Sequence, residues 1–162
     1  MRIAVCLYNS NNGRYTRWVT LPENSYRLGQ IIEQLCPNVD DDCVIVDYKT
    51  QFYPEDLTRY DIYYLNELVS NLNSYATDKE IQALLESYST NLEDIQQKVQ
   101  RGGYKFYANK TLMDVAEEMA ETEQYSNYCR LDGEIEYDKI VDDLCKLGYE
   151  QTSTGVIHIY GY

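Results

Sequence analysis

Basic residues are scarce in this chain of 162 residues. It has 14 Lys and Arg against 27 Asp and Glu, with a single His, so its formal net charge is −13. A protein that binds DNA or RNA needs Lys and Arg to replace the counterions around the phosphates. The shortage of cations therefore argues against a nucleic-acid-binding protein.

Long hydrophobic runs are also missing. No stretch of 18 apolar residues occurs, and the first residues do not show a basic segment followed by an apolar one. A membrane helix needs about 20 apolar residues, and a secretory signal needs that two-part pattern. The five cysteines form an odd number without a Cys-x-x-Cys pair, which is typical of a reducing compartment. We expect a cytoplasmic protein that does not contact a membrane.

The motifs of common catalytic and cofactor sites are absent. The sequence contains no Gly-x-Ser-x-Gly, no phosphate-binding P-loop, no Gly-x-Gly-x-x-Gly and no His-Glu-x-x-His. The one histidine, His158, lies in an apolar strand pattern, which favours a packing role over that of a general base. Asp40, Asp41 and Asp42 lack the alternating ligand spacing of a calcium loop. We expect no enzyme activity, no metal and no cofactor.

Tyrosine is abundant where the other aromatic residues are few. The chain has 18 Tyr beside 2 Phe and 1 Trp. A Tyr side chain buries a large ring and leaves its hydroxyl in water, so these residues could build thin cores with wet edges. Tyr is also enriched at protein interfaces. Both interpretations stay open.

The apolar pattern predicts an α+β fold in three small consecutive units. Residues 1–60 have the pattern of a ββαβ unit, with strands at 2–8, 15–21 and 43–48 and a helix at 24–36. Residues 61–103 are expected to form a helical bundle, because Thr77-Asp-Lys-Glu80 and Asn91-Leu-Glu-Asp94 resemble helix starts. Residues 104–162 are expected to form a mixed α/β unit, with strands at 104–107 and 156–160 and helices after Thr111 and at 137–147.

Acidic residues become denser toward the C-terminus. Residues 104–162 hold 12 acids against 5 bases. In the helix predicted after Thr111, the acids Asp114, Glu117, Glu118 and Glu121 repeat at helical spacing, which places carboxylates roughly 5.4 Å apart along one face. The face could be a functional row of negative charge. It could also be an ordinary solvated face on which Asp114 is a cap.

The order of several short segments resembles the antirestriction protein ArdA family, which is found on bacterial plasmids, transposons and phages. The segments are Asn12-Gly13, Trp18-Val-Thr-Leu-Pro22, Val46-Asp47-Tyr48, Tyr60, Leu65-Asn66-Glu67-Leu68, Tyr104-Lys-Phe-Tyr107 before the helix at Leu112, Tyr137-Asp138 and Thr154-Gly155-Val156. They span nearly the whole chain. Where the family has a Tyr-Gly-Arg-Asp run after Tyr137, this chain has Ile140-Val-Asp-Asp143.

The resemblance implies an elongated homodimer, joined through its C-terminal unit, that mimics bent duplex DNA in the bacterial cytoplasm. Such a protein occupies the DNA-binding groove of a type I restriction-modification enzyme, its methyltransferase and specificity core, and inhibits it without catalysis. The candidate partner-binding acids are Asp114, Glu117, Glu118, Glu121, Glu123, Glu134, Glu136, Asp138, Asp142 and Asp143, with Asp61 and Glu67 as secondary members. The alternative is an acidic, Tyr-rich adaptor that binds a protein through apolar contacts, for example at Tyr125 or Tyr128.

Overall fold

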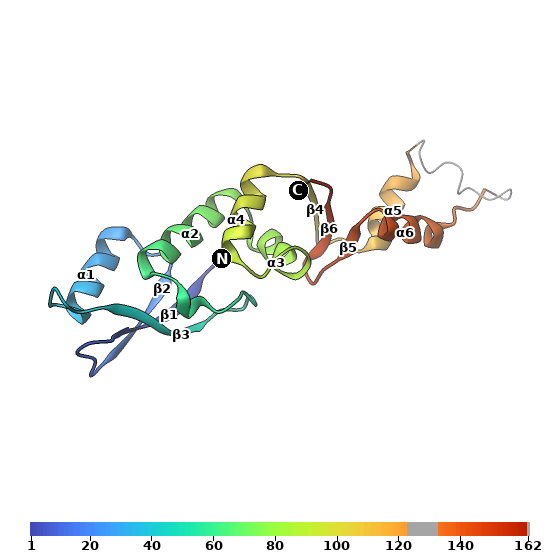
Figure 1. Cartoon of the computed structure of the whole chain (residues 1–162). Coiled ribbons are helices and arrows are strands. Elements are labelled where there is room, and N and C mark those ends of the chain that lie inside the picture. The colour runs from blue at the N-terminus through green and yellow to red at the C-terminus, as the bar shows by residue number, and fades with distance from the viewer. Residues whose placement is uncertain (123–132, 162) are drawn as a thin grey trace.

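The computed structural model describes residues 1–122 and 133–161. Within these ranges the chain forms six α-helices and two three-stranded antiparallel sheets, which confirms the predicted α+β class. The molecule is elongated: one sheet with α1 lies at one end, helices α2 to α4 lie in the middle, and the second sheet leads to α5 and α6 at the other end (Figure 1). No helix of the described ranges has the length and apolar character needed to cross a bilayer.

The first sheet is built as the sequence predicts. Its elements are β1 (Ile3–Asn9), β2 (Thr16–Leu21), α1 (Ser25–Leu35) and β3 (Cys43–Lys49), with the strand order β2-β1-β3. β1 pairs antiparallel with both neighbours, so the ββαβ prediction is confirmed. Ile3, Val5 and Leu7 alternate along β1 and are fully buried, because they point toward the core that α1 covers with Leu28 and Ile31.

Side-chain hydrogen bonds fix the turn of this hairpin. The buried Asn9 side chain accepts the backbone N–H groups of Asn11 and Asn12 at 3.2 and 3.1 Å and donates to the Leu35 carbonyl at 3.2 Å. Gly13 lies against the Tyr8 ring, and a Cβ there would be 2.2 Å from that ring. The turn therefore requires a residue without a side chain, and Asn9 joins it to the end of α1.

The middle of the molecule is helical. After the short 3₁₀ helix η1 (Leu57–Arg59) come α2 (Ile62–Tyr75), α3 (Asp78–Ser87) and α4 (Leu92–Arg101). The predicted capping box is present at the start of α3, where the Thr77 hydroxyl and the Glu80 carboxylate accept each other's backbone N–H groups. Asn91 caps α4 by accepting two backbone N–H groups at 2.9 and 3.1 Å. Both helix starts are therefore confirmed.

A buried amide joins α2 to the N-terminal unit. Asn66 is only 6% exposed. Its Oδ1 accepts the Glu23 N–H at 2.8 Å, and its Nδ2 donates to the Glu23 carbonyl at 2.9 Å. The two bonds satisfy the backbone of the segment between β2 and α1, which would otherwise have unpaired polar groups against α2.

The second sheet carries the C-terminal helices. Its strands are β4 (Tyr104–Ala108), β5 (Tyr149–Gln151) and β6 (Gly155–Ile159) in the order β4-β6-β5, and its helices are α5 (Leu112–Ala120) and α6 (Tyr137–Lys146). The sequence patterns predict β4, β6 and both helices but not β5. β5 has only three residues, of which two are exposed, so it lacks an apolar alternation that could be recognised.

Buried apolar residues of the described chain gather in two cores that share strand β6. The larger core runs from the first sheet through α2, α3 and α4 and includes Ile157. The smaller core consists of Val115, Ala116, Ile140, Leu144 and Val156. Because neighbouring residues of a strand point to opposite faces, Ile157 and Val156 enter different cores. The second sheet therefore separates the middle helices from the pair α5 and α6.

Candidate functional site

Helix α5 presents carboxylates to solvent because its apolar residues face the smaller core. Val115 and Ala116 are fully buried, while Glu117, Glu118 and Glu121 are exposed. The separation of the apolar and acidic faces follows the spacing predicted from the sequence. Glu117 and Glu121 are one turn apart, so their carboxylates repel each other.

Negative charge is stabilised at the start of α5 and destabilised at its end. Asp114 completes a capping box at the start: its Oδ2 accepts the Thr111 N–H at 2.7 Å, and its own N–H donates to the Thr111 hydroxyl at 3.1 Å. The Thr111 backbone hydrogen bond lowers the pKa of Asp114, with a further contribution from the hydroxyl, so this carboxylate stays ionised. Glu121 is the C-terminal cap, where the helix dipole disfavours an anion, and no basic residue lies in the last turn.

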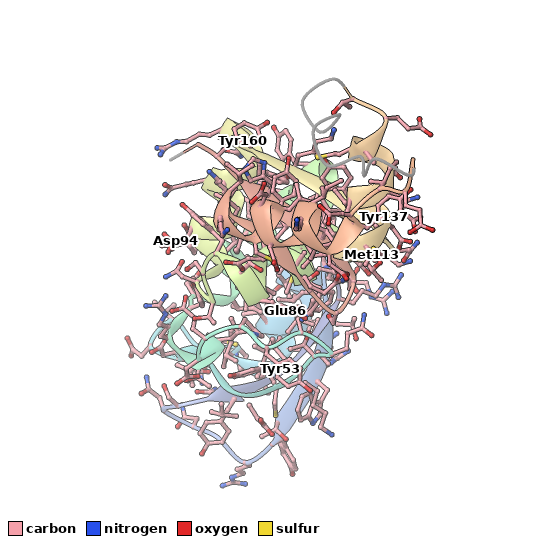
Figure 2. The ribbon with its side chains drawn as sticks, turned by 90° about the vertical axis from the view of Figure 1, so that its right-hand side faces the viewer. Tyr53, Glu86, Asp94, Met113, Tyr137 and Tyr160 are labelled. Carbon is pink, nitrogen blue, oxygen red and sulfur yellow. The ribbon has the colours of Figure 1, made fainter. Side chains whose placement is uncertain are left out.

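Helix α6 adds a second group of acids at the same end of the molecule. Ile140 and Leu144 are buried, and Asp138 and Asp142, one turn apart, are exposed. α6 packs against α5, which brings the acids of the two helices to one end. Figure 2 views the molecule from this end, with α5 and α6 toward the viewer. Asp143 is partly buried and Glu134 is exposed.

Only some of these acids have a basic partner. Lys110 contacts Glu118 at 2.9 Å, Lys139 contacts Glu136 at 2.7 Å, and Lys146 contacts Asp143 at 3.7 Å. The predicted acids with no Lys or Arg nitrogen within 4.0 Å among the described residues are Asp61, Glu67, Asp114, Glu117, Glu121, Asp138 and Asp142. Five of these seven lie on α5 and α6, at the C-terminal end of the molecule.

Of the two secondary acids, Asp61 immediately precedes α2 and Glu67 lies on it, in the middle of the molecule (Figure 1). Asp61 caps this helix by accepting the Tyr64 N–H at 3.0 Å, and Glu67 is exposed one and a half turns later. A hydrogen bond from the Tyr64 hydroxyl to the Glu93 carboxylate raises the pKa of Tyr64. This bond joins α2 to the start of α4, and both acids are separate from the α5 and α6 group.

Two further exposed or half-exposed acids at the start of α4, Glu93 and Asp94, extend the charge of the middle unit. The sequence motif Asn91-Leu-Glu-Asp94 indicates a helix start and gives no reason to include its acids among the candidate partner-binding residues. α2 packs against α4, which places Glu93 beside Tyr64. The sequence does not show this packing between separate helices. Its only indication of these two acids is that they occur in the first turn of a predicted helix. The candidate acid Glu123 lies outside the described residues, as do Tyr125 and Tyr128, the examples given for the adaptor hypothesis.

A cavity of about 400 Å³ opens between the starts of α5 and α6. It is lined by Met113 and by residues 134–139. Met113 and Tyr137 lie on the same side of this end of the molecule (Figure 2). The lining combines three acids with an exposed thioether and a ring, so the acidic end also offers some apolar surface.

His158 has the position in a strand that the sequence predicts. It lies in β6, its Nε2 is 3.1 Å from the Leu147 carbonyl oxygen, and its ring stacks on Tyr149 with centroids 4.0 Å apart. These contacts explain the orientation of the ring by packing. Among residues 1–122 and 133–161, no group of three or more His, Cys, Asp or Glu side chains is arranged to hold a metal ion.

Neither the comparison with protein-family models nor the search of curated proteins gives a match for this chain. The functional argument therefore rests on the surface of the molecule itself.

Proposed function

We propose that this protein is a DNA-mimicking antirestriction protein. Its carboxylates would occupy the DNA-binding groove of a type I restriction-modification enzyme in a bacterial cytoplasm, as the resemblance to the ArdA family implies. The protein would act as a homodimer joined through its C-terminal unit and without catalysis. The observation that carries the proposal is the set of exposed acids without basic partners at one end of an elongated molecule (Figure 1).

The charge of the molecule is of the right magnitude for a mimic. Duplex DNA carries one negative charge per ~1.7 Å of its axis. A dimer with a net charge of −13 on each chain would match roughly 44 Å of duplex, and its full set of carboxylates would match roughly 92 Å. These lengths are on the scale of a restriction-enzyme footprint.

The placement of Glu117 and Glu121 also favours a functional role over a stabilising one. The two carboxylates repel each other, and Glu121 lies at the helix end where an anion is disfavoured. Neither has a basic partner among the described residues that would offset this cost. Binding to a basic groove would convert the repulsion into attraction.

The experiment is a competition between this protein and DNA for a purified type I methyltransferase core. The protein should displace DNA at low salt, and its affinity should fall steeply as salt is raised, because the attraction is between charged surfaces. Absence of competition at low salt would contradict the proposal.

A matched pair of variants separates position from total charge. Glu117→Gln, Glu121→Gln, Asp138→Asn and Asp142→Asn, combined, remove four charges from α5 and α6. Glu33→Gln, Asp40→Asn, Asp42→Asn and Asp47→Asn remove four exposed charges from the N-terminal unit. We expect the first variant to lose about 100-fold in affinity, from roughly 0.7 kcal/mol per lost charge contact, and the second to lose less than about tenfold. Equal losses would contradict a specific role for α5 and α6.

The adaptor hypothesis is the second candidate, and the exposed tyrosines favour it. Tyr15, Tyr26, Tyr53 and Tyr160 are each at least 63% exposed. An adaptor that used these rings would bind its partner with little dependence on salt, since burial of apolar surface is not screened by ions. A Tyr26→Ser, Tyr53→Ser variant would then lose binding while the variant with four neutralised acids on α5 and α6 would keep it.

A further inference from the structure

One face of the N-terminal sheet points away from the core and contains a depression. Adjacent positions across the sheet are Thr20 on β2, Ala4 on β1 and Lys49 on β3, so these three side chains lie in one row. This face is opposite to the one that carries Ile3 and Val5 into the core. Because Ala4 is small, the middle of the row is low, and a depression of about 530 Å³ lies over it.

The lining of this depression is cationic and rich in hydroxyl groups. It consists of Arg2, Ala4, Thr20, Lys49, Thr50, Gln51 and Asp78. Arg2 and Lys49 are exposed, and no carboxylate of the described residues lies within 4.0 Å of either. The one acid of the lining, Asp78, already pairs with the Met1 ammonium group.

The surroundings hold one of these cations in place. The Lys49 ammonium lies over the Trp18 ring, 4.9 Å from its centroid. This cation–π contact restrains the side chain without neutralising it. The nearest acid of the next row, Asp47, uses Oδ1 to accept the Tyr48 N–H at 2.8 Å. A guanidinium, an ammonium, two hydroxyls and the carboxylate of Asp78 thus surround a depression whose size is in the range of small-molecule sites.

We propose that this depression binds the phosphate group of a small phosphorylated ligand. The Arg2 guanidinium can donate two parallel hydrogen bonds to phosphate oxygens, and Lys49 supplies a point charge. The Thr20 hydroxyl can donate to a remaining oxygen, whereas the Thr50 hydroxyl donates to the Arg2 carbonyl oxygen at 3.4 Å. Trp18, one row away and 43% exposed, lies within reach of a planar group attached to the phosphate.

Trp18 is the only tryptophan of the chain, so its fluorescence reports directly on this face. The protein is titrated with inorganic phosphate and then with adenosine monophosphate, at constant ionic strength maintained with chloride. We expect a saturable change in emission with both ligands, with tighter binding of the nucleotide because its base can reach the indole. Calorimetric titration gives the same constants without relying on Trp18. A response that chloride alone reproduces would overturn the proposal.

Variants test the assignment. Lys49→Ala should weaken binding of adenosine monophosphate by about tenfold or more in the calorimetric titration, since a hydrogen bond to a charged group contributes about 1.5–3 kcal/mol. Arg2→Ala should have a similar effect. Arg14→Ala is the matched control, because Arg14 is exposed on the hairpin turn of the same sheet and does not line the depression. Equal losses in all three variants would indicate general screening by charge and would overturn the site.

A further titration tests whether the depression binds an acidic peptide instead of a phosphate group. If a hexaglutamate peptide binds and phosphate does not, the assignment to a phosphorylated ligand is wrong. Circular dichroism of each variant checks that its fold is intact, and Lys49→Gln replaces Lys49→Ala if that fold is disturbed. None of these measurements involves a restriction enzyme, so their outcome is independent of the proposed antirestriction function.

Discussion

At the N-terminal end, the exposed cations Arg2 and Lys49 have no carboxylate within 4.0 Å among the described residues, whereas at the C-terminal end Glu117 and Asp142 have no cation within that distance. The ends also differ in their interiors. The first sheet shares a large core with the middle helices, whereas among the described residues the core formed by α5, α6 and β6 has five fully buried members. The comparison suggests that packing stabilises the N-terminal and middle parts, while the C-terminal end presents charge at some expense of stability.

The largest expected effect comes from the two cores. Leu84 on α3 and Leu144 on α6 are both fully buried, one in each core. We expect Leu84→Ala to lower the free energy of unfolding by about 3–5 kcal/mol and Leu144→Ala by about 2–3 kcal/mol, because the partly exposed neighbours of Leu144 can close part of the cavity. Urea unfolding followed by circular dichroism measures both. Leu147→Ala, at a site that is 54% exposed, should stay within about 0.5 kcal/mol. A greater loss for Leu144→Ala would reverse the comparison.

A smaller loss is expected at the buried amide of α2. Asn66→Ala leaves the Glu23 N–H and carbonyl without their partners, which should lower the free energy of unfolding by about 1–3 kcal/mol. The same urea titration measures it, with Gln97→Ala on the exposed side of α4 as a control expected to change little. If Asn66→Ala is neutral, hydrogen bonding contributes little to the stability of the N-terminal part.

The third prediction concerns acid pH at the C-terminal end. The pKa of Asp114 is lowered below its ordinary value of 3.8 by the Thr111 hydrogen bonds, so its contribution to stability is complete above that value. The contribution is lost as the pH falls through the lowered pKa, where the carboxyl becomes protonated in the folded protein too. The difference in melting temperature between the parent protein and Asp114→Asn should therefore disappear at low pH.

Thr111→Ala provides the control for that pH series. It removes the hydroxyl cap at a cost of about 0.5–2 kcal/mol but keeps the backbone N–H that Asp114 accepts. Part of the acid dependence should therefore remain. A constant difference between the parent protein and Asp114→Asn from neutral pH to pH 2 would show that Asp114 does not act as an ionised cap.

The smallest effect is a gain in stability. Glu121→Gln removes an anion from the unfavourable end of α5 and its repulsion with Glu117, which should raise the free energy of unfolding by about 0.3–1 kcal/mol at low salt. The gain should shrink at high salt, where these interactions are screened. If Glu121→Gln instead lowers the free energy of unfolding, the acids at the C-terminal end do not destabilise the fold.

Local rules account for the elements that the sequence predicts correctly. The Thr77 capping box, the caps at Asn91 and Thr111 and the apolar spacing of Val115 and Ala116 are set by residues within four positions of one another. The same spacing predicts which face of α5 is exposed. The acidic character of the candidate site was therefore available from the sequence.

Contacts between distant segments account for what was missed. The bonds of Asn66 join it to Glu23, 43 positions away, and the pairing of β5 with β6 gives three residues a strand conformation that their own pattern does not indicate. The ion pair of Lys110 with Glu118 and the contact of Tyr64 with Glu93 likewise depend on how separate elements pack. Which acids are paired and which remain unpaired could be learned only from the structure.

Strand β6 places a restriction on how this chain can change in evolution. Val156 faces one core and Ile157 the other, so deletion or insertion of one residue would turn every later side chain of the strand to the wrong compartment. Changes of length should accordingly be tolerated in the connections and rejected between Gly155 and Ile159. Substitutions that exchange the sizes of Val156 and Ile157 would have to be matched on both sides of the sheet at once.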